Sequence, residues 1–441
     1  MQKQTANSGK DYLWLIIGAS LIGLLVSVLV WLFSQAFNVI NSLMFNGVGE
    51  LLAPYGRWTI ALIPAVGGLI VALIMRFNQP EKLAGMAHLI DGVAEYEGRL
   101  NDRNGLIFIL ASMVGIGFGA PVGADTPSAM IGGHLVSSLA KRFHMKQVLV
   151  LPLLVSAVAA GIAATYFAQF SAIFFALEIV LGGFGGALFV VPVLVSVGAS
   201  ALFTFLVTGL WSPYPPVPVV YHVNWATLFY LLPALLASLA AITYVRLLPG
   251  MKKFFMGLHI PTWSKPAIAG LVVGIVGIWV PEIFGTGLSQ MKQIFSGTTF
   301  TFGMLIAILF CRIILTPSSL GSGFAGGVIG PALAIGSALG LAFGQAVVFF
   351  FPNLGFTPVE FAMVATAVML AATFHAPLFG SMMILEMTSS YQLLVPIFVC
   401  AAIGYAIARR FQPGSAYTFG LHGQGIFLEY GKFTIGENRD K

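Results

Sequence analysis

Long, almost uncharged apolar runs constrain the fold of this chain more than any other feature of its sequence. Four of them are unbroken and cover residues 13–33, 58–75, 228–245 and 304–315. A helix needs about 20 apolar residues to cross a bilayer, and the runs lack the alternation of transmembrane barrel strands. The sequence therefore predicts an all-α polytopic membrane protein, with the first run kept as a helix.

The composition excludes the common soluble classes of protein. Only 8% of the 441 residues are charged and 58% are hydrophobic, whereas a soluble domain carries about 25% charged residues. The net charge of +6 comes from residues at segment ends and in the tails, as in multi-pass proteins. We therefore expect a multi-pass protein of the cell inner membrane, and not an enzyme or a nucleic-acid binder.

The sequence predicts no cofactor and no metal site. Cys311 and Cys400 lie in apolar stretches without the spacing of a disulfide framework or a metal site. Residues 321–326 match the pattern G-x-G-x-x-G, but no strand-helix-strand unit surrounds them, which argues against dinucleotide binding.

An internal repeat is the most informative pattern. Residues 163–178 (AATYFAQFSAIFFALE) align with 371–386 (AATFHAPLFGSMMILE), and residues 117–133 align with 321–337. The offsets of 208 and 204 residues are nearly equal, so we interpret the chain as two copies of one unit. The expected organisation is an N-terminal tail (1–11), a first transmembrane repeat (12–210), a linker (211–225), a second transmembrane repeat (226–408) and a C-terminal segment without a regulatory domain (409–441).

Both copies interrupt an apolar region with glycines, which are followed by a proline. Gly123 precedes Pro127 in the first copy, and Gly326 precedes Pro331 in the second. Proline is tolerated near a helix start because its missing N–H would be unpaired there anyway. Each copy is therefore expected to start a helix inside the protein, and broken helices at matching positions typically bracket a transport site.

A helix that starts in a low-dielectric region favours a bound anion, because its first N–H groups are unpaired and its N-terminus is partly positive. The two predicted starts lie near Asp125 and near Gly327, Val328 and Ile329. Either glycine-rich segment alone is better explained as close helix packing. The repetition, together with a carboxylate inside the membrane, favours an anion site.

Asp125 lies between apolar flanks, where an ionisable residue is expensive and is usually functional. A carboxylate that caps the helix start occupies the place of the anion. We therefore interpret Asp125 as a gate that competes with the transported ion.

Glu178 and Glu386 hold equivalent positions in the two copies, which favours a structural role in capping or bridging over ion handling. Arg312 is predicted to be a buried partner of one of these carboxylates. His88 and His375 are interpreted as buried histidines rather than proton carriers.

Several of these blocks resemble the CLC family of chloride channels and chloride/proton antiporters. The strongest match is HAPLFGSMMILEMTSSYQLLVP at residues 375–396; GGVIGP (326–331), GADTPSAMIGG (123–133) and PGSAY (413–417) follow the family pattern as well.

The resemblance implies two inverted-topology repeats of broken, tilted helices, about eighteen in all, in a homodimer with one anion pathway per subunit. It implies that Val328 and Ile329 offer backbone N–H groups and Tyr417 a hydroxyl, and that Asp125 replaces the gating glutamate.

Three departures from the family pattern bear on function. The aspartate is shorter than glutamate by one C–C bond of about 1.5 Å, which would leave closure incomplete. Ile179 stands where the antiporters carry a second glutamate, which favours the channel branch. Gly85 stands where a serine lines the anion site, with Met86 beside it, and this keeps fluoride as an alternative substrate.

The sequence thus predicts a CLC-type protein that moves chloride or a similar small anion in a channel-like way. A fluoride/proton or chloride/proton antiporter on the same scaffold stays an alternative. A non-conducting membrane protein, such as a lipid scramblase or an assembly subunit, is the alternative from another class.

Overall fold

The computed structural model describes residues 9–78, 85–94, 98, 100–183, 186–209, 214, 216–219 and 225–419. Most of the expected N-terminal tail, much of the linker and the C-terminal segment after residue 419 lie outside the described residues.

The described residues form helices joined by short turns, and no strand longer than an isolated bridge occurs among them. The α-helices are α1 (Gly9–Ser42), α2 (Gly49–Leu52), α3 (Leu62–Met75), α4 (Met86–Ala94), α5 (Asp102–Gly117), α6 (Asp125–Arg142), α7 (Gln147–Tyr166), α8 (Gln169–Phe174), α9 (Ala187–Thr208), α10 (Leu231–Gly257), α11 (Ser264–Gly277), α12 (Leu288–Phe295), α13 (Phe302–Ser322), α14 (Ile329–Phe350), α15 (Pro358–Phe374), α16 (Pro377–Thr388) and α17 (Leu394–Phe411). Two π-helical turns, η1 (Leu43–Val48) and η4 (Phe175–Val180), extend α1 and α8. Single 3-10 turns lie at η2 (Ala53–Tyr55), η3 (Arg57–Ala61), η5 (Trp225–Tyr230), η6 (Pro281–Ile283), η7 (Pro352–Leu354) and η8 (Tyr391–Leu393).

Eight helical segments of the described chain are long and apolar enough to cross a bilayer. The four unbroken apolar runs of the sequence lie in α1, in η3 with α3, in η5 with α10, and in α13. Large apolar side chains such as Leu21, Leu206 and Leu239 point away from the protein interior, as expected of helices that face lipid. The prediction of an all-α membrane protein is confirmed.

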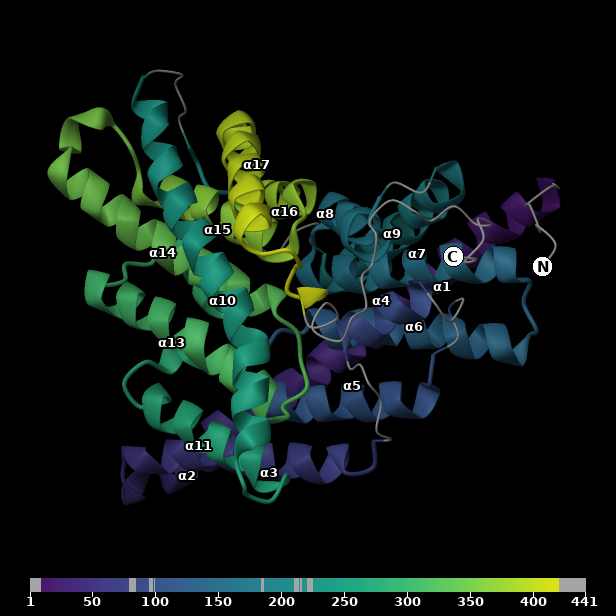
Figure 1. The fold of residues 1–441 in the computed structure, drawn as a ribbon, viewed down its shortest axis with the longest axis horizontal. Coiled ribbons are helices and arrows are strands. Elements are labelled where there is room, and N and C mark those ends of the chain that lie inside the picture. The colour runs from purple at the N-terminus through teal and green to yellow at the C-terminus, as the bar shows by residue number, and fades with distance from the viewer. Residues whose placement is uncertain are drawn as a thin grey trace.

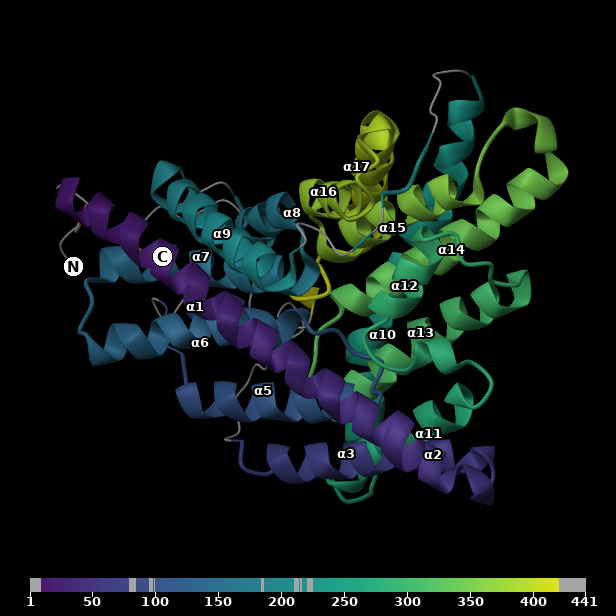
Figure 2. The same cartoon turned by 180° about the vertical axis from the view of Figure 1, so that it is seen from behind.

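The two halves of the chain lie side by side. The first half, purple through blue to the teal of α9, and the second half, from the teal of α10 through green to yellow, meet along the middle of the molecule (Figure 1). Helix α1 crosses the back as a long diagonal (Figure 2), where it packs on α5, α7 and α9. The interior between the halves contains the first turns of α6 and α14 and the helix pair α8 and α16.

Equivalent residues of the two repeats adopt the same unusual backbone conformation. Phe167 and His375, separated by the predicted offset of 208 residues, have φ angles of 56° and 57° and end α7 and α15. Non-glycine residues rarely adopt this left-handed conformation. Its recurrence at matching positions supports the division of the chain into two copies of one unit.

Glu178 and Glu386 join the two repeats through a reciprocal pair of helix caps. Each carboxylate accepts two hydrogen bonds from backbone N–H groups in the first turn of the short helix of the other repeat. The distances are 3.3 and 2.8 Å from Glu178 to the nitrogens of Leu378 and Phe379, and 2.8 and 2.7 Å from Glu386 to those of Phe170 and Ser171. A carboxylate at a helix N-terminus satisfies donors that the helix leaves free.

The predicted pairing of Arg312 with one of these two glutamates is wrong. The guanidinium of Arg312 is fully buried and donates to the carbonyl oxygens of Glu282, at 2.7 Å, and Gly285, at 3.2 Å. The reason is geometric, because α13 carries Arg312 beside the loop after η6, while Glu178 and Glu386 are already engaged with backbone donors.

Candidate functional site

The two interrupted segments meet directly at the centre of the molecule. The N–H of Gly123 donates to the carbonyl of Gly327 and the N–H of Gly327 donates to the carbonyl of Gly123, both at 2.7 Å. This antiparallel bridge joins residues that are 204 positions apart, which is the offset of the sequence repeat. Helices α6 and α14 begin at Asp125 and Ile329, two residues after the bridge.

Glycine is required at both positions of the bridge. A Cβ atom on Gly327 would lie 2.0 Å from Oδ2 of Asp125, and a Cβ atom on Gly123 would lie 2.1 Å from Oδ1. The absence of side chains therefore creates the space that the Asp125 carboxylate fills.

The Asp125 carboxylate is fully buried and is surrounded by five hydrogen-bond donors, which we call the donor ring. The ring consists of two backbone N–H groups from the start of α14 and three hydroxyl groups. The donors and their distances are Val328 N and Ile329 N, both at 3.1 Å, and the hydroxyls of Tyr417 at 2.8 Å, Tyr166 at 3.2 Å and Thr126 at 3.3 Å. None of the five is a cationic side chain, so the ring is a neutral site for a negatively charged group.

The bridge also explains how an aspartate reaches this position. It holds the start of α6 against the start of α14, so the short side chain of Asp125 contacts both N–H groups. The shorter side chain of aspartate thus reaches the start of α14 in this structure.

The other predicted site residues lie around this centre at different distances. Gly326 precedes the bridge, and Pro127 and Pro331 each occupy the third position of their helix. Gly85 has a φ angle of 64°, and a Cβ atom on it would lie 3.2 Å from Cγ2 of Thr126. Met86 starts α4 and is buried, but neither Gly85 nor Met86 belongs to the donor ring.

Ile179 and His88 are not among the donors to the Asp125 carboxylate. Ile179 is 2% exposed and sits in η4, one position after Glu178. The rings of His88 and His134 are stacked with their centroids 6.4 Å apart.

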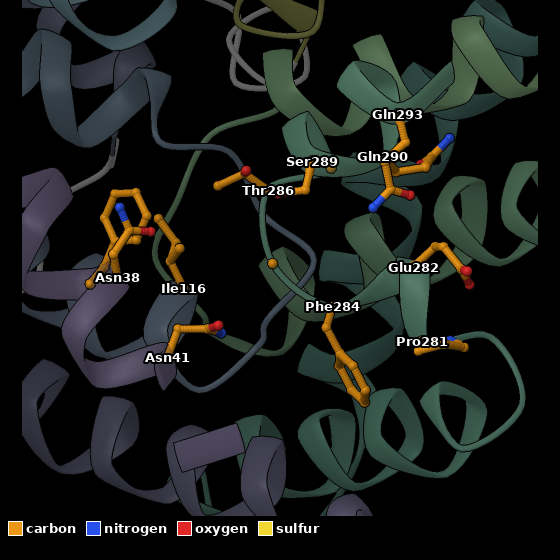
Figure 3. Close-up of a pocket in the computed structure, with 13 residues that line it drawn as sticks. Asn38, Asn41, Ile116, Pro281, Glu282, Phe284, Thr286, Ser289, Gln290 and Gln293 are labelled. Carbon is orange, nitrogen blue, oxygen red and sulfur yellow. The ribbon is translucent and has the colours of Figure 1, made fainter. Parts of the chain in front are cut away.

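A polar cavity of about 330 Å³ is bordered by the loop of residues 284–287 (Figure 3). A Cβ atom on Gly330, in the first turn of α14, would meet the carbonyl oxygen of Thr286 at 2.5 Å. Thr286 therefore contacts both the cavity and the first turn of α14. The cavity is lined by Phe37, Asn38, Asn41, Ile116, Pro281, Glu282, Phe284, Gly285, Thr286, Gly287, Ser289, Gln290 and Gln293.

Comparison with known proteins identifies the family. The sequence matches the family profile described as voltage gated chloride channel over residues 66–409, which is most of the chain. The chain belongs to this CLC family.

CLC relatives match nearly the full length of the chain. A protein of Ralstonia nicotianae named as ClcB-like is 30% identical over 371 residues, covering 82% of this chain and 86% of the relative. The voltage-gated ClC-type chloride channel ClcB of Salmonella dublin is 28% identical over 409 residues, covering 90% and 97%.

A solved structure has the same fold. The crystal structure of a slow cyanobacterial Cl⁻/H⁺ antiporter superposes with a TM-score of 0.84 at 22% identity, over 93% of this chain and 97% of that one. The chain is thus a multi-pass membrane protein with the CLC fold, and its family transports anions rather than catalysing reactions.

Two members of the donor ring, Thr126 and Tyr166, were not among the predicted site residues, and Tyr166 is the one that comes from a distant helix. The signal was present in the repeat, because AATY at residues 163–166 aligns with AATF at 371–374. The first copy thus carries a hydroxyl where the second carries the ring of Phe374 without one.

Proposed function

We propose that this CLC protein moves chloride or a similar small anion across the membrane in a channel-like way, with Asp125 as its gate. The observation that carries the proposal is the position of the Asp125 carboxylate inside the donor ring. A group that carries the same charge as the substrate and takes up the same donors competes with it for the site. The gate is closed when the carboxylate is inside, and it opens when the side chain leaves and an anion replaces it.

Val328, Ile329 and Tyr417 are the proposed anion ligands in the open state. The N–H groups of Val328 and Ile329 point at the carboxylate from the start of α14, and the Tyr417 hydroxyl approaches at 2.8 Å. Gly327 provides the room, and Gly85 and Met86 are proposed to line the path beside α6. A site built from neutral donors binds an anion weakly enough for it to leave again.

Channel-like transport is favoured by the environment of Ile179. This residue is apolar and buried, directly after Glu178, whose carboxylate is engaged with backbone donors of α16. The position therefore offers no acid that could exchange protons with one side of the membrane. The polar cavity beyond Thr286 supports the proposal as a hydrated approach to α14.

A fluoride/proton antiporter is the second candidate, and the observation that favours it is Gly85. The backbone of Gly85 lies beside Thr126 and brings no hydroxyl to the anion path, so the path differs from one that holds chloride through a serine.

We also propose that two copies of the chain form a homodimer, which light scattering in detergent would test.

Replacement of Asp125 by alanine tests the gate. A hydrogen bond to a charged group is worth about 1.5–3 kcal/mol. If the closed state is favoured by the equivalent of one such bond, its loss in Asp125→Ala should raise chloride efflux from liposomes roughly 10–100-fold. Asp102→Ala is the matched control, because Asp102 is a partly exposed carboxylate that pairs with Lys141 outside the donor ring. Unchanged efflux in Asp125→Ala, or equal effects in both variants, would remove Asp125 from the gate.

Reversal potentials under opposed chloride and pH gradients test the transport mode. A potential that follows only the chloride gradient is expected, whereas one that shifts with the pH gradient would establish proton coupling. Fluoride efflux far above chloride efflux would favour the second candidate, and no anion efflux at all would favour a non-conducting membrane protein.

A further inference from the structure

Tyr166 places a hydroxyl group in the donor ring from a third direction. It is the last residue of α7, it is fully buried, and its hydroxyl donates to Oδ1 of Asp125 at 3.2 Å. The two backbone donors come from α14, and Tyr417 comes from the segment after α17. Tyr166 therefore adds a donor from α7 to the donors that come from α6, α14 and the segment after α17.

We infer that the Tyr166 hydroxyl is itself an anion ligand that sets the affinity of the open site. This inference rests on the proposed function, because it assumes that an anion replaces the Asp125 carboxylate. It adds a residue to the predicted ligands Val328, Ile329 and Tyr417.

The donors are divided between the two carboxylate oxygens of Asp125. Oδ2 accepts from Val328 N and from the hydroxyls of Tyr417 and Thr126, whereas Oδ1 accepts from Ile329 N and the hydroxyl of Tyr166. Without Tyr166, one side of the site would keep a single donor. An anion that fills the ring therefore needs this hydroxyl to be held from both sides.

The Tyr166 hydroxyl loses its acceptor when the Asp125 gate opens. The Tyr166 oxygen also faces the backbone N–H of Gly330, so its own proton is left to donate towards Asp125. A buried hydroxyl that loses its acceptor without a replacement costs free energy. Once Asp125 swings out, the entering anion is the acceptor that restores the hydrogen bond.

The two repeats differ at the position of Tyr166. Phe374, the counterpart of Tyr166, packs its ring against Tyr417 with centroids 5.1 Å apart and has no hydroxyl to offer. The aromatic ring is thus common to both copies and serves packing. The hydroxyl is present only in the copy that also carries the gate.

The test is chloride binding in the Asp125→Ala background, measured by isothermal titration calorimetry in detergent. Because the carboxylate is gone, Tyr166→Phe removes a donor to the anion without disturbing the gate, and we expect about a tenfold rise in the Kd for chloride. Tyr417→Phe should give a rise of similar size. Tyr230→Phe is the matched control, because it removes a buried hydroxyl that donates to the carboxylate of Glu360 at 2.7 Å.

The outcomes separate this inference from the proposed function. A Kd within twofold of the parent for Tyr166→Phe, with a clear loss for Tyr417→Phe, overturns the inference and leaves the anion site intact. Equal losses for Tyr166→Phe and Tyr230→Phe overturn it as well, since the effect is then a general consequence of removing buried hydroxyls. A folded Asp125→Ala protein that binds no chloride contradicts the proposed function itself.

Discussion

Replacement of Gly327 by alanine is expected to expel both the Asp125 carboxylate and any anion from the donor ring. The new Cβ atom would lie 2.0 Å from Oδ2, 2.2 Å from Cγ and 2.4 Å from Oδ1 of Asp125. Ordinary van der Waals contact begins at 3.4 Å, so a group in this place has to retreat by about 1.4 Å, the difference between 3.4 and 2.0 Å.

A displacement of this size breaks the hydrogen bonds that define the site. The contacts from Val328 N and Ile329 N are 3.1 Å long, and a retreat of more than about 0.4 Å along their direction takes them past hydrogen-bond distance. Two charge-assisted bonds are worth about 3 kcal/mol at the lower end of their range. The expected result is roughly 100-fold weaker anion binding.

The assay compares Asp125→Ala with the double variant Asp125→Ala/Gly327→Ala, using chloride titration calorimetry and efflux from liposomes. Because Asp125→Ala removes the competing carboxylate, the difference in chloride affinity between the two variants measures the effect of the added methyl group alone. The double variant should fold normally, because the three atoms nearest to the new Cβ all belong to the side chain of Asp125.

Gly330→Ala is the contrasting control, since its Cβ atom would meet the backbone oxygen of Thr286 at 2.5 Å and not the site. We expect this variant to lose thermal stability. If the double variant bound chloride as tightly as Asp125→Ala, the anion would not occupy the place of the carboxylate, and the reasoning would be refuted.

Two further predictions concern buried charges that hold the fold. Glu178→Gln and Glu386→Gln each lose one oxygen acceptor of a reciprocal cap. Both variants should therefore lower the free energy of unfolding by similar amounts of about 1–3 kcal/mol, measured by thermal unfolding in detergent. A large effect in only one of them would contradict their equivalence. Arg312→Met leaves the carbonyls of Glu282 and Gly285 without their donor, so it should lower the free energy of unfolding by about 1–3 kcal/mol. Anion affinity in the Asp125→Ala background should be unchanged. A selective loss of affinity at unchanged stability would show instead that Arg312 acts on the anion.

The helix starts at the centre of the molecule were predictable because they depend on local chemistry. Glycines followed by Pro127 and Pro331 end one segment and begin the next, and the structure starts α6 and α14 within two residues of these prolines. The apolar runs likewise become helices, since a helix pairs its own backbone groups in lipid. Both inferences need only the residues within one or two turns.

The partners of the buried charges were not predictable in the same way. Arg312 was expected to pair with a carboxylate, yet it binds two carbonyl oxygens of a loop 27 to 30 residues away. Tyr166 gave only a weak signal, the difference from Phe374 in the other repeat. A long-range hydrogen bond depends on where two distant helices end. The offset between the repeats shows which residues are equivalent, but it does not show which residues are in contact.

By itself, the sequence determined that this chain spans a membrane, that it contains two related units and that a lone carboxylate lies at a helix start. These conclusions follow from composition, repetition and local propensity, which can be read along the chain without knowing how it folds. Only the tertiary structure decided that Gly123 and Gly327 pair, and that donors from α7, α14 and the segment after α17 converge on Asp125. The physical reason is that an anion site without cationic side chains takes its affinity from several weak donors, and these act together only when the fold brings their separate elements to one point.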